Sequence, residues 1–249
     1  MNDSIVVIPS YNEIENIEAI IRKVFSLSQS FDVLIVDDGS PDGTAAVVKR
    51  LMTEFQGNLH IQERKGKLGL GTAYIHGFKW ALERGYEYIF EMDADFSHPP
   101  EDLIRLHYAC AVEKHDVAIG SRYITGVNVV NWPINRVLMS YFAGTYVRMI
   151  TGMGIMDPTA GFICYTSKVL RTINLDSIQF IGYAFQIEMK FNSWKYGFDI
   201  VEVPIIFTDR TRGTSKMSPG IFKEAVLGVM SLKINSFFKR YIPMHQALK

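Results

Sequence analysis

Two aspartates separated by a single residue, Asp93 and Asp95, follow a short apolar run that predicts a β-strand. In extended backbone the side-chain period is two, so both carboxylates point the same way. Two hard oxygen ligands on one side suit Mg²⁺ or Mn²⁺, which complete their shell with substrate phosphates and water. The spacing by itself fits a metal site and a plain pair of solvated acids, or a helix cap before Pro99, equally well.

Two other polar segments follow predicted strands. Residues 9–13 follow the first strand, and the adjacent Asp37 and Asp38 follow the second. Ligands of open α/β sheets bind beyond the carboxyl ends of the strands, so we expect these carboxylates to converge on one rim. Residues 37–43 are rich in turn formers, so the segment predicts either a simple turn or a site for the base and ribose of a nucleotide.

The chain lacks the common signatures of other site types. It contains no P-loop, no G-x-G-x-x-G, no G-x-S-x-G, no HExxH and no CxxC motif, so the glycines at positions 66, 69 and 71 predict entry into a helix. The two cysteines, Cys110 and Cys164, have no metal-type spacing, and we expect no disulfide framework.

Strands and helices alternate through the first half of the sequence. Strands are predicted at residues 5–8, 33–36, 59–61, 88–92 and 117–119, and helices at 13–27, from Asp42 or Thr44 to 55, at 72–84 and at 101–112. The second half predicts helices at 134–151, 185–196 and 221–241 and one strand at 200–207. This order predicts an α/β fold with a mostly parallel, doubly wound sheet and C-terminal amphipathic helices.

The charge of the chain is unevenly distributed. The 249 residues include 26 basic and 26 acidic ones, and a net charge of zero argues against nucleic acid as a partner. Residues 209–249 contain eight basic and two acidic residues, a net charge of +6, which leaves −6 for residues 1–208. Such asymmetry favours an anionic partner, such as phosphate or a membrane surface.

We expect no signal peptide and no membrane span. The N-terminal apolar run is short, and the longest apolar region, residues 137–156, is interrupted by Arg148. A protein of this kind that works at a membrane would lie on its surface.

Six segments in sequence order resemble glycosyltransferase family 2 and, within it, the dolichol-phosphate mannose synthases that lack C-terminal transmembrane spans. They are VIPSYNE (7–13), VDDGSPDGT (36–44), GLGTA (69–73), MDADFSH (92–98), GSRY (120–123), and DR (209–210) followed by SK (215–216). The likeness covers residues 4–217. It implies a GT-A nucleotide-sugar fold, with a catalytic domain at 1–217 and a C-terminal amphipathic helical extension at 218–249 that packs on it or on a membrane surface.

The resemblance also implies roles for individual residues. The nucleotide, with guanine as the usual base, would contact Pro9, Tyr11, Glu13, Ile35 and Asp37. Mg²⁺ or Mn²⁺ on the donor diphosphate would bind Asp93 and Asp95, with Ala94 touching the donor through its backbone. The positions for anion binding near the two phosphates are Arg122, Arg210 and Lys216, and those for the acceptor phosphate are Arg136 and Ser140.

Two local features bear on that assignment. Archaeal relatives have a glutamine as a further metal ligand where this chain has Ser97, so the third ligand is left open, and the neighbouring His98 is predicted to be structural. Enzymes of the family that use hydroxyl acceptors often carry a Glu-Asp pair as the base; here the segment is Gln186, Ile187, Glu188. We expect Glu188 to pair with an arginine.

The predicted activity is an inverting, metal-dependent transfer of mannose from GDP-mannose to a polyprenyl or dolichyl monophosphate. A divalent ion and basic side chains would stabilise the leaving diphosphate, and an anionic phosphate acceptor needs no general base. The alternatives are a different donor such as UDP-glucose, a nucleotidyltransferase, and a non-catalytic nucleotide-sugar-binding protein. The predicted location is peripheral, on the cytoplasmic face of a membrane, with a small membrane-protein partner left open.

Overall fold

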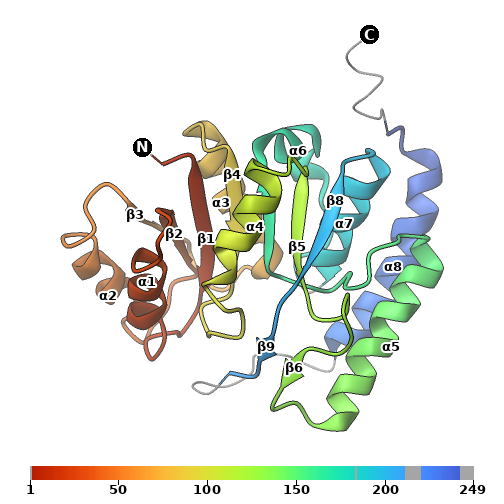
Figure 1. The fold of residues 1–249 in the computed structure, drawn as a ribbon, viewed down its shortest axis with the longest axis horizontal. Helices are drawn as coiled ribbons and strands as arrows, with labels where there is room; N and C mark the ends of the chain where they lie inside the picture. Colours follow the sequence, from red (N-terminus) through yellow and green to blue (C-terminus); the bar gives the residue numbers. More distant parts are fainter. Residues whose placement is uncertain (1, 183, 211–219, 242–249) are drawn as a thin grey trace.

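The computed structural model describes residues 2–182, 184–210 and 220–241, and for residues 220–226 it gives the backbone alone. A seven-stranded sheet forms its centre (Figure 1). The strands are β1 (Ser4–Ser10), β2 (Asp32–Asp37), β3 (Leu59–Glu63), β4 (Tyr88–Glu91), β5 (Val117–Ser121), β7 (Ile163–Thr166) and β8 (Ile200–Pro204). Across the sheet their order is β3-β2-β1-β4-β7-β5-β8.

The sheet is parallel except at one strand. β7 lies between β4 and β5 and runs antiparallel to both, whereas every other neighbouring pair is parallel. The predicted mostly parallel sheet is therefore confirmed, but the sequence analysis missed β7. A second, two-stranded sheet pairs β6 (Val129–Val130) with β9 (Phe207–Thr208).

Helices cover both faces of the sheet. Strands that are buried on two sides in this way are expected to be apolar along most of their length. In β1, Val6 and Ile8 join the core formed with α1, α2 and α4, while Ile5 and Val7 join the core formed with α3, α6 and α7. The helices are α1 (Ile17–Phe25), α2 (Thr44–Leu51), α3 (Leu70–Glu83), α4 (Asp102–Ala111), α5 (Ile134–Thr151), α6 (Ser167–Thr172), α7 (Ala184–Lys195) and α8 (Gly220–Phe238), with a short 3-10 helix η1 (Leu175–Ser177).

The predicted elements recur with small changes of boundary. The helix predicted at 134–151 has those bounds as α5, whereas the one predicted at 13–27 begins only at Ile17. Asp42 or Thr44 was the predicted cap of α2, but the N-cap is Gly43; Asp42, one residue earlier, accepts a hydrogen bond of 3.0 Å from the backbone N–H of Thr44. The strand predicted at 200–207 is divided between β8 and β9.

The C-terminal helix packs on the rest of the protein. α8 contacts α5 and α7, and its Val229 and Leu232 belong to the core (Figure 1). The predicted domain boundary at residue 217 lies outside the described residues. Among the described residues no helix is long and apolar enough to cross a membrane.

The close approach of α3 to β1 gives a first prediction. A Cβ added to Gly77 would lie 2.4 Å from Cγ1 of Val7 in β1. Overpacking of this kind costs about 1–3 kcal/mol, and the better helix propensity of alanine returns about 1 kcal/mol. Gly77→Ala should therefore lower the free energy of unfolding by up to about 2 kcal/mol in urea denaturation. The control is Gly154→Ala, whose Cβ meets nothing within 4 Å; equal stability of the two variants would contradict the prediction.

Candidate active site

The carboxylates of Asp93 and Asp95 lie just beyond the end of β4, at the edge where β1 and β2 also end. The Asp93 side chain is 40% exposed, whereas Asp95 is buried. The phenol of Tyr74, from α3, donates to Oδ1 of Asp93 at 3.4 Å. The pair predicted from Asp-x-Asp spacing therefore stands on the rim, with one member open to solvent.

The two carboxylates differ in their electrostatic environment. Burial, together with the charge of Asp95, raises the pKa of Asp93 above its usual range. Burial also acts to raise the pKa of Asp95, but hydrogen bonds from Ser97 and the charge of Arg210 outweigh it, so this pKa lies below its usual range. Arg210 pairs with Oδ2 of Asp95 at 2.8 Å, and the backbone N–H of Ser97 donates to Oδ1 at 3.0 Å.

The donor set fits Mg²⁺ or Mn²⁺. Among the described residues no three His, Cys, Asp or Glu side chains form a metal-binding cluster. Mg²⁺ commonly uses one or two carboxylates and takes its other ligands from phosphate and water, so the partly open pair of Asp93 and Asp95 suits it. Ser97, a possible third ligand because it stands where archaeal relatives have the further metal ligand, is buried and contacts Asp95 through its backbone N–H.

His98 is structural, as predicted. Its ring is buried and stacks on Phe162 at 5.1 Å, and its Nδ1 accepts the backbone N–H of Asp93 at 3.4 Å. Burial lowers the pKa of His98 to about 4. A neutral imidazole therefore supports the turn that carries the aspartates.

The residues expected at the nucleotide differ in their accessibility. Tyr11 and Glu13 lie half-buried at the end of β1, and the charge of Glu13 contributes to the raised pKa of Asp93. Asp37 is buried and accepts hydrogen bonds from Ser10 and Ser40. The side chain of Ile35 is fully buried in the core, so it does not reach the rim.

The remaining predicted donor residues are Pro9, Ala94 and Lys216. Pro9 lies half-buried near the end of β1, and Ala94 is buried between the two aspartates. Lys216 lies outside the described residues.

An ion pair not predicted from the sequence shapes the rim beside β2. Arg64 donates from Nε to Oδ1 of Asp38 at 2.6 Å, and the backbone N–H of Leu68 donates to Oδ2 at 3.1 Å. These bonds hold the loop after β3 against the rim, where the Lys67 ammonium lies 5.5 Å from the centre of the Tyr11 ring. The position of Arg64 directly after β3, at the edge of the sheet where the aspartates lie, is the sequence signal that could have identified it.

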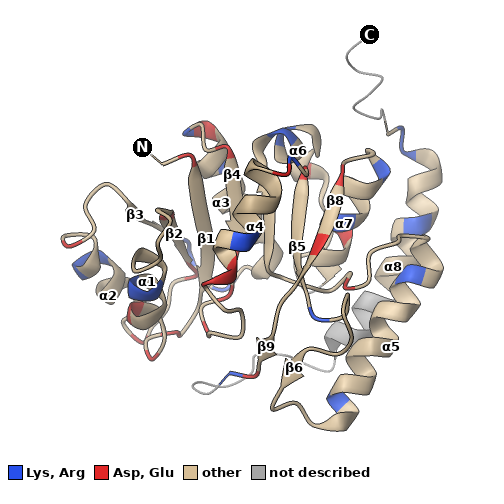
Figure 2. Cartoon of the chain, viewed as in Figure 1, with Lys and Arg blue, Asp and Glu red and all other residues tan. Residues whose placement is uncertain are grey.

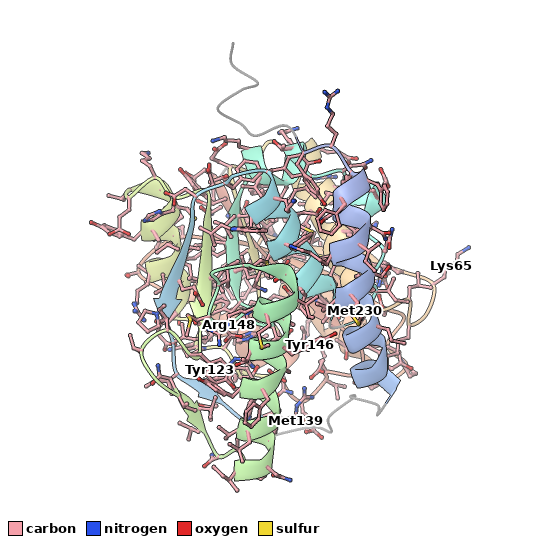
Figure 3. The ribbon with its side chains drawn as sticks, turned by 90° about the vertical axis from the view of Figure 1, so that its right-hand side faces the viewer. Lys65, Tyr123, Met139, Tyr146, Arg148 and Met230 are labelled. Atoms are coloured by element: carbon pink, nitrogen blue, oxygen red, sulfur yellow. The ribbon has the colours of Figure 1, made fainter. Side chains whose placement is uncertain are left out.

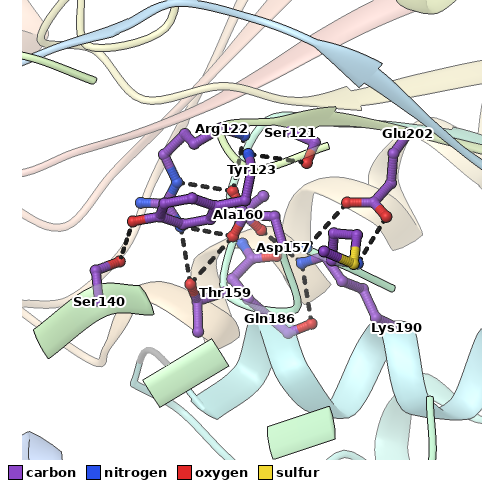
Figure 4. A network of polar contacts seen from close by, with 11 residues as sticks. Ser121, Arg122, Tyr123, Ser140, Asp157, Thr159, Ala160, Gln186, Lys190 and Glu202 are labelled. Carbon is purple, nitrogen blue, oxygen red and sulfur yellow. Dashed lines mark hydrogen bonds and ion pairs between the residues drawn. The ribbon is translucent and has the colours of Figure 1, made fainter. Parts of the chain in front are cut away.

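Arg122 is held by a buried carboxylate. Its Nε and Nη2 donate to the two oxygens of Asp157, each at 2.7 Å, and Nη2 also donates to Thr159 at 2.8 Å (Figure 4). Asp157 is fully buried, and the Arg122 side chain is 10% exposed. The structure thus directs the Arg122 guanidinium toward Asp157, and no bond to Asp93 or Asp95 is among its described contacts.

The two residues expected at the acceptor phosphate lie on α5. Arg136 pairs with Asp209 through Nη1 at 2.7 Å, and its guanidinium lies 4.1 Å above the Trp132 ring. The Ser140 hydroxyl accepts a hydrogen bond of 2.8 Å from Tyr123 (Figure 4). Both side chains are half-buried.

A buried polar network lies behind the rim. Gln186 donates to Glu91, the last residue of β4. Lys190 donates to the carbonyl oxygens of Ala160 and Gln186 (Figure 4). Burial raises the pKa of Glu91 to about 8 and lowers that of Lys190 to about 8. The network joins α7 to the strand that carries the aspartates.

The expectation for Glu188 is wrong within the described part of the chain. Its carboxylate accepts the backbone N–H groups of Gln179 and Phe180, at 2.9 and 3.0 Å, rather than an arginine. These two backbone N–H groups belong to the segment before α7. The sequence pattern did not reveal that Glu188 would accept their hydrogen bonds.

Comparison with known proteins defines the family. Residues 5–173 match the family described as glycosyl transferase family 2, and the chain belongs to this family. It is 46% identical over 226 residues to the polyprenol monophosphomannose synthase of Mycolicibacterium smegmatis, covering 91% of this chain and 85% of that protein. It is also 46% identical over 223 residues to the undecaprenyl-phosphate mannosyltransferase of Micrococcus luteus, covering 90% of each.

Solved structures share the fold. One is the glucosyl-3-phosphoglycerate synthase of Mycobacterium tuberculosis in complex with Mn²⁺, UDP and phosphoglyceric acid, with a TM-score of 0.66, 17% identity, and coverage of 93% of this chain and 78% of that one. Another is a mannosyltransferase of Pyrobaculum calidifontis in complex with GDP-Man and Mn²⁺, with a TM-score of 0.59, 15% identity, and coverage of 97% and 66%. The chain is a glycosyltransferase with the predicted GT-A-like α/β fold.

The Arg122–Asp157 pair gives a prediction for stability. Asp157→Asn leaves a buried guanidinium without its counter-charge, a loss of about 3–5 kcal/mol in the free energy of unfolding at pH 7. The control is Asp176→Asn, which removes an exposed pair with Lys79 and should cost less than about 1 kcal/mol. Similar losses in guanidinium denaturation of the two variants would rule out a structural role for the pair.

The same pair predicts a pH dependence. Burial acts to raise the pKa of Asp157, but the charge and hydrogen bonds of Arg122 outweigh it and lower this pKa below its usual range. The carboxylate therefore stabilises the folded state above the unfolded pKa of about 4, and the contribution disappears as the pH falls through the folded value. Between pH 5 and pH 2 the Asp157→Asn variant should lose less stability than the wild type.

Proposed function

We propose that this glycosyltransferase moves mannose from GDP-mannose to a polyprenyl or dolichyl monophosphate, with inversion, and so forms polyprenyl-phosphate mannose and GDP. The observation that carries the proposal is the 46% identity, over about nine tenths of the chain, to two proteins named for mannose transfer to polyprenyl phosphates. The site residues support it, because acidic and basic side chains meet at one edge of the sheet.

The acidic side chains suit the donor. Asp93 and Asp95 would hold Mg²⁺ or Mn²⁺, which neutralises charge on the leaving diphosphate. Arg210 lies next to this pair, bonded to Asp95, and a guanidinium is a suitable partner for a phosphate oxygen as well. Lys216 and Arg122 are the other cations proposed for the donor side. Pro9, Tyr11, Glu13, Asp37 and Ala94 complete the proposed donor set, and Ile35 is left out of it because its side chain is buried in the core.

The acceptor side needs positive groups rather than a base. A phosphate monoester is already an anionic nucleophile, so it must be oriented and need not be deprotonated. Arg136 and Ser140 are four residues apart on α5 and so share one face of the helix. Together they offer a charged donor and a hydroxyl to the same phosphate.

A lipid acceptor requires contact with a membrane, and α5 and α8 present a surface for it. The two helices lie side by side (Figure 3). Residues 134–151 and 227–241 contain five basic and no acidic residues, and the described parts of both helices show Lys and Arg without Asp or Glu (Figure 2). Large apolar side chains are exposed at Ile134, Leu138, Met139, Tyr141, Phe142, Met149, Leu227, Met230, Ile234, Phe237 and Phe238.

We assign this surface, called here the α5–α8 face, to the cytoplasmic side of an anionic membrane. Apolar side chains flanked by basic ones bind at the boundary between headgroups and acyl chains. Each basic residue near an anionic leaflet contributes about 1 kcal/mol, so several hold a protein there reversibly.

The first test is a screen of donors and acceptors. The chain is incubated with radiolabelled GDP-mannose or UDP-glucose, Mg²⁺ or Mn²⁺, and a polyprenyl phosphate, and label is measured in the organic phase. We expect label from GDP-mannose only. Transfer only from UDP-glucose would change the donor, label only in a water-soluble glycan would overturn the lipid-phosphate acceptor, and release of pyrophosphate would indicate a nucleotidyltransferase.

The metal site gives a mutational prediction. Asp93→Asn and Asp95→Asn should each lower the rate of transfer by about 100- to 1000-fold, because a bound metal contributes several kcal/mol of charge stabilisation. Both variants should also lose Mn²⁺-dependent binding of GDP in titration calorimetry, whereas Asp176→Asn should behave as the wild type. Full transfer in either variant would exclude these aspartates as metal ligands.

The α5–α8 face gives a prediction for membrane binding. The full chain should float with vesicles that contain phosphatidylglycerol and less with neutral ones, and binding should fall with added salt. Phe142→Ser combined with Phe237→Ser should weaken binding about tenfold or more, because two exposed aromatic rings lose their burial in lipid. The matched control, Tyr108→Ser with Val112→Ser, alters exposed apolar side chains at α4. Equal flotation of both double variants would contradict the assignment.

A further inference from the structure

The two side chains proposed for the acceptor phosphate are held from outside their own helix. Arg136 and Ser140 lie on α5, but the hydrogen-bonding partners of their functional atoms, Asp209 and Tyr123, come from segments next to β9 and β5. A long arginine side chain and a rotating hydroxyl have many orientations, so partners of this kind decide where they point.

Asp209 is itself firmly placed. Its backbone N–H donates to the carbonyl of Val130 at 3.1 Å, which continues the pairing of β6 with β9. The preceding residue, Thr208, donates to the carbonyl of Ser97 at 3.3 Å, beside the carboxylate pair. Asp209 is thus tied through its backbone to the rim that carries Asp95.

The Asp209 carboxylate uses both oxygens. Oδ2 accepts Nη1 of Arg136 at 2.7 Å, and Oδ1 accepts the backbone N–H of Arg210 at 3.1 Å. Trp132 covers one face of the Arg136 guanidinium. Within the described residues no other side chain bonds to this guanidinium. Asp209 therefore holds one edge of it and Trp132 covers one face, and its other N–H groups can donate to a ligand.

Tyr123 acts in a similar way on Ser140. Its ring is buried, and it follows Arg122, which Asp157 anchors. The phenol donates to Oγ of Ser140 at 2.8 Å. A serine hydroxyl has one proton, and because its oxygen accepts from Tyr123, that proton is free to be donated in another direction.

We propose that Asp209 and Tyr123 are positioning residues for the acceptor: Asp209 orients the Arg136 guanidinium and Tyr123 orients the Ser140 hydroxyl, so that both donate to the phosphate of the incoming lipid. This inference rests on the proposed function, since it takes a phosphate monoester as the acceptor. Asp209 and Tyr123 would not touch the phosphate themselves, and both lie outside α5.

The experiment uses the full chain and a short, water-soluble prenyl phosphate, so that membrane binding does not enter. Tyr123→Phe removes one neutral hydrogen bond and should lower kcat/KM for the acceptor about fivefold. Asp209→Asn removes a charged partner and should lower it about tenfold or more. The affinity for GDP with Mn²⁺, measured by calorimetry, should stay within twofold of the wild type.

Double variants separate positioning from a general structural effect. In a Ser140→Ala background, Tyr123→Phe should cause no further loss, and in an Arg136→Ala background, Asp209→Asn should cause none. Tyr108→Phe and Asp176→Asn, which alter an exposed phenol and an exposed carboxylate elsewhere, are the matched controls and should keep the wild-type rate.

Each outcome decides one question. Unchanged or increased kcat/KM in the single variants, or equal losses in the double backgrounds, would overturn the positioning role. A wild-type chain that transfers no mannose to any prenyl phosphate would overturn the proposed function itself. Loss of GDP binding together with acceptor turnover would show that the two residues only support the fold of the site.

Discussion

The repulsion between Asp93 and Asp95 is the constraint on which the rest of the site depends. Two carboxylates a single residue apart, at the end of a strand whose last residue is the buried Glu91, need positive charge close by. The structure supplies Arg210 to Asp95 and leaves Asp93 partly open, with a raised pKa. An open carboxylate beside a paired one is what a divalent ion requires, since it must bring phosphate and water as its other ligands.

The sheet positions the acidic side chains of the site, whereas the basic side chains come from other segments. Parallel strands β1, β2 and β4 deliver acidic and polar side chains to one edge, in the manner of open α/β sheets. The cations come from segments outside this alternation: Arg210 follows β9, and Arg136 lies on α5. Of these two cations, Arg210 belongs to the basic segment 209–249, whereas Arg136 lies in the part of the chain whose net charge is −6.

Much of this arrangement was predictable, and the part that was not has a physical reason. The strand-end carboxylates and the helix at 134–151 follow from periodicity and spacing, because these are local properties of the chain. The antiparallel strand β7 is a short apolar run, and no local signal gives its direction. The partners of the arginines were missed because Asp157 lies 35 residues from Arg122, and Asp209 lies 73 residues from Arg136. Such pairs form only when distant loops pack together. A sequence pattern can therefore identify a charged residue but not the residue of opposite charge that pairs with it.

The missed partners connect Arg210 and Arg136 through carboxylates. Asp95 bonds the side chain of Arg210, the backbone of Arg210 bonds Asp209, and Asp209 bonds Arg136, so acidic and basic residues alternate along this series of contacts. A guanidinium donates hydrogen bonds to carboxylate and phosphate oxygens with similar geometry. A phosphate bound at either arginine, as proposed, would meet a group already oriented by a carboxylate. Asp209 thus contacts both arginine residues, the guanidinium of Arg136 and the backbone N–H of Arg210, and a single carboxylate links α5 to the segment after β9.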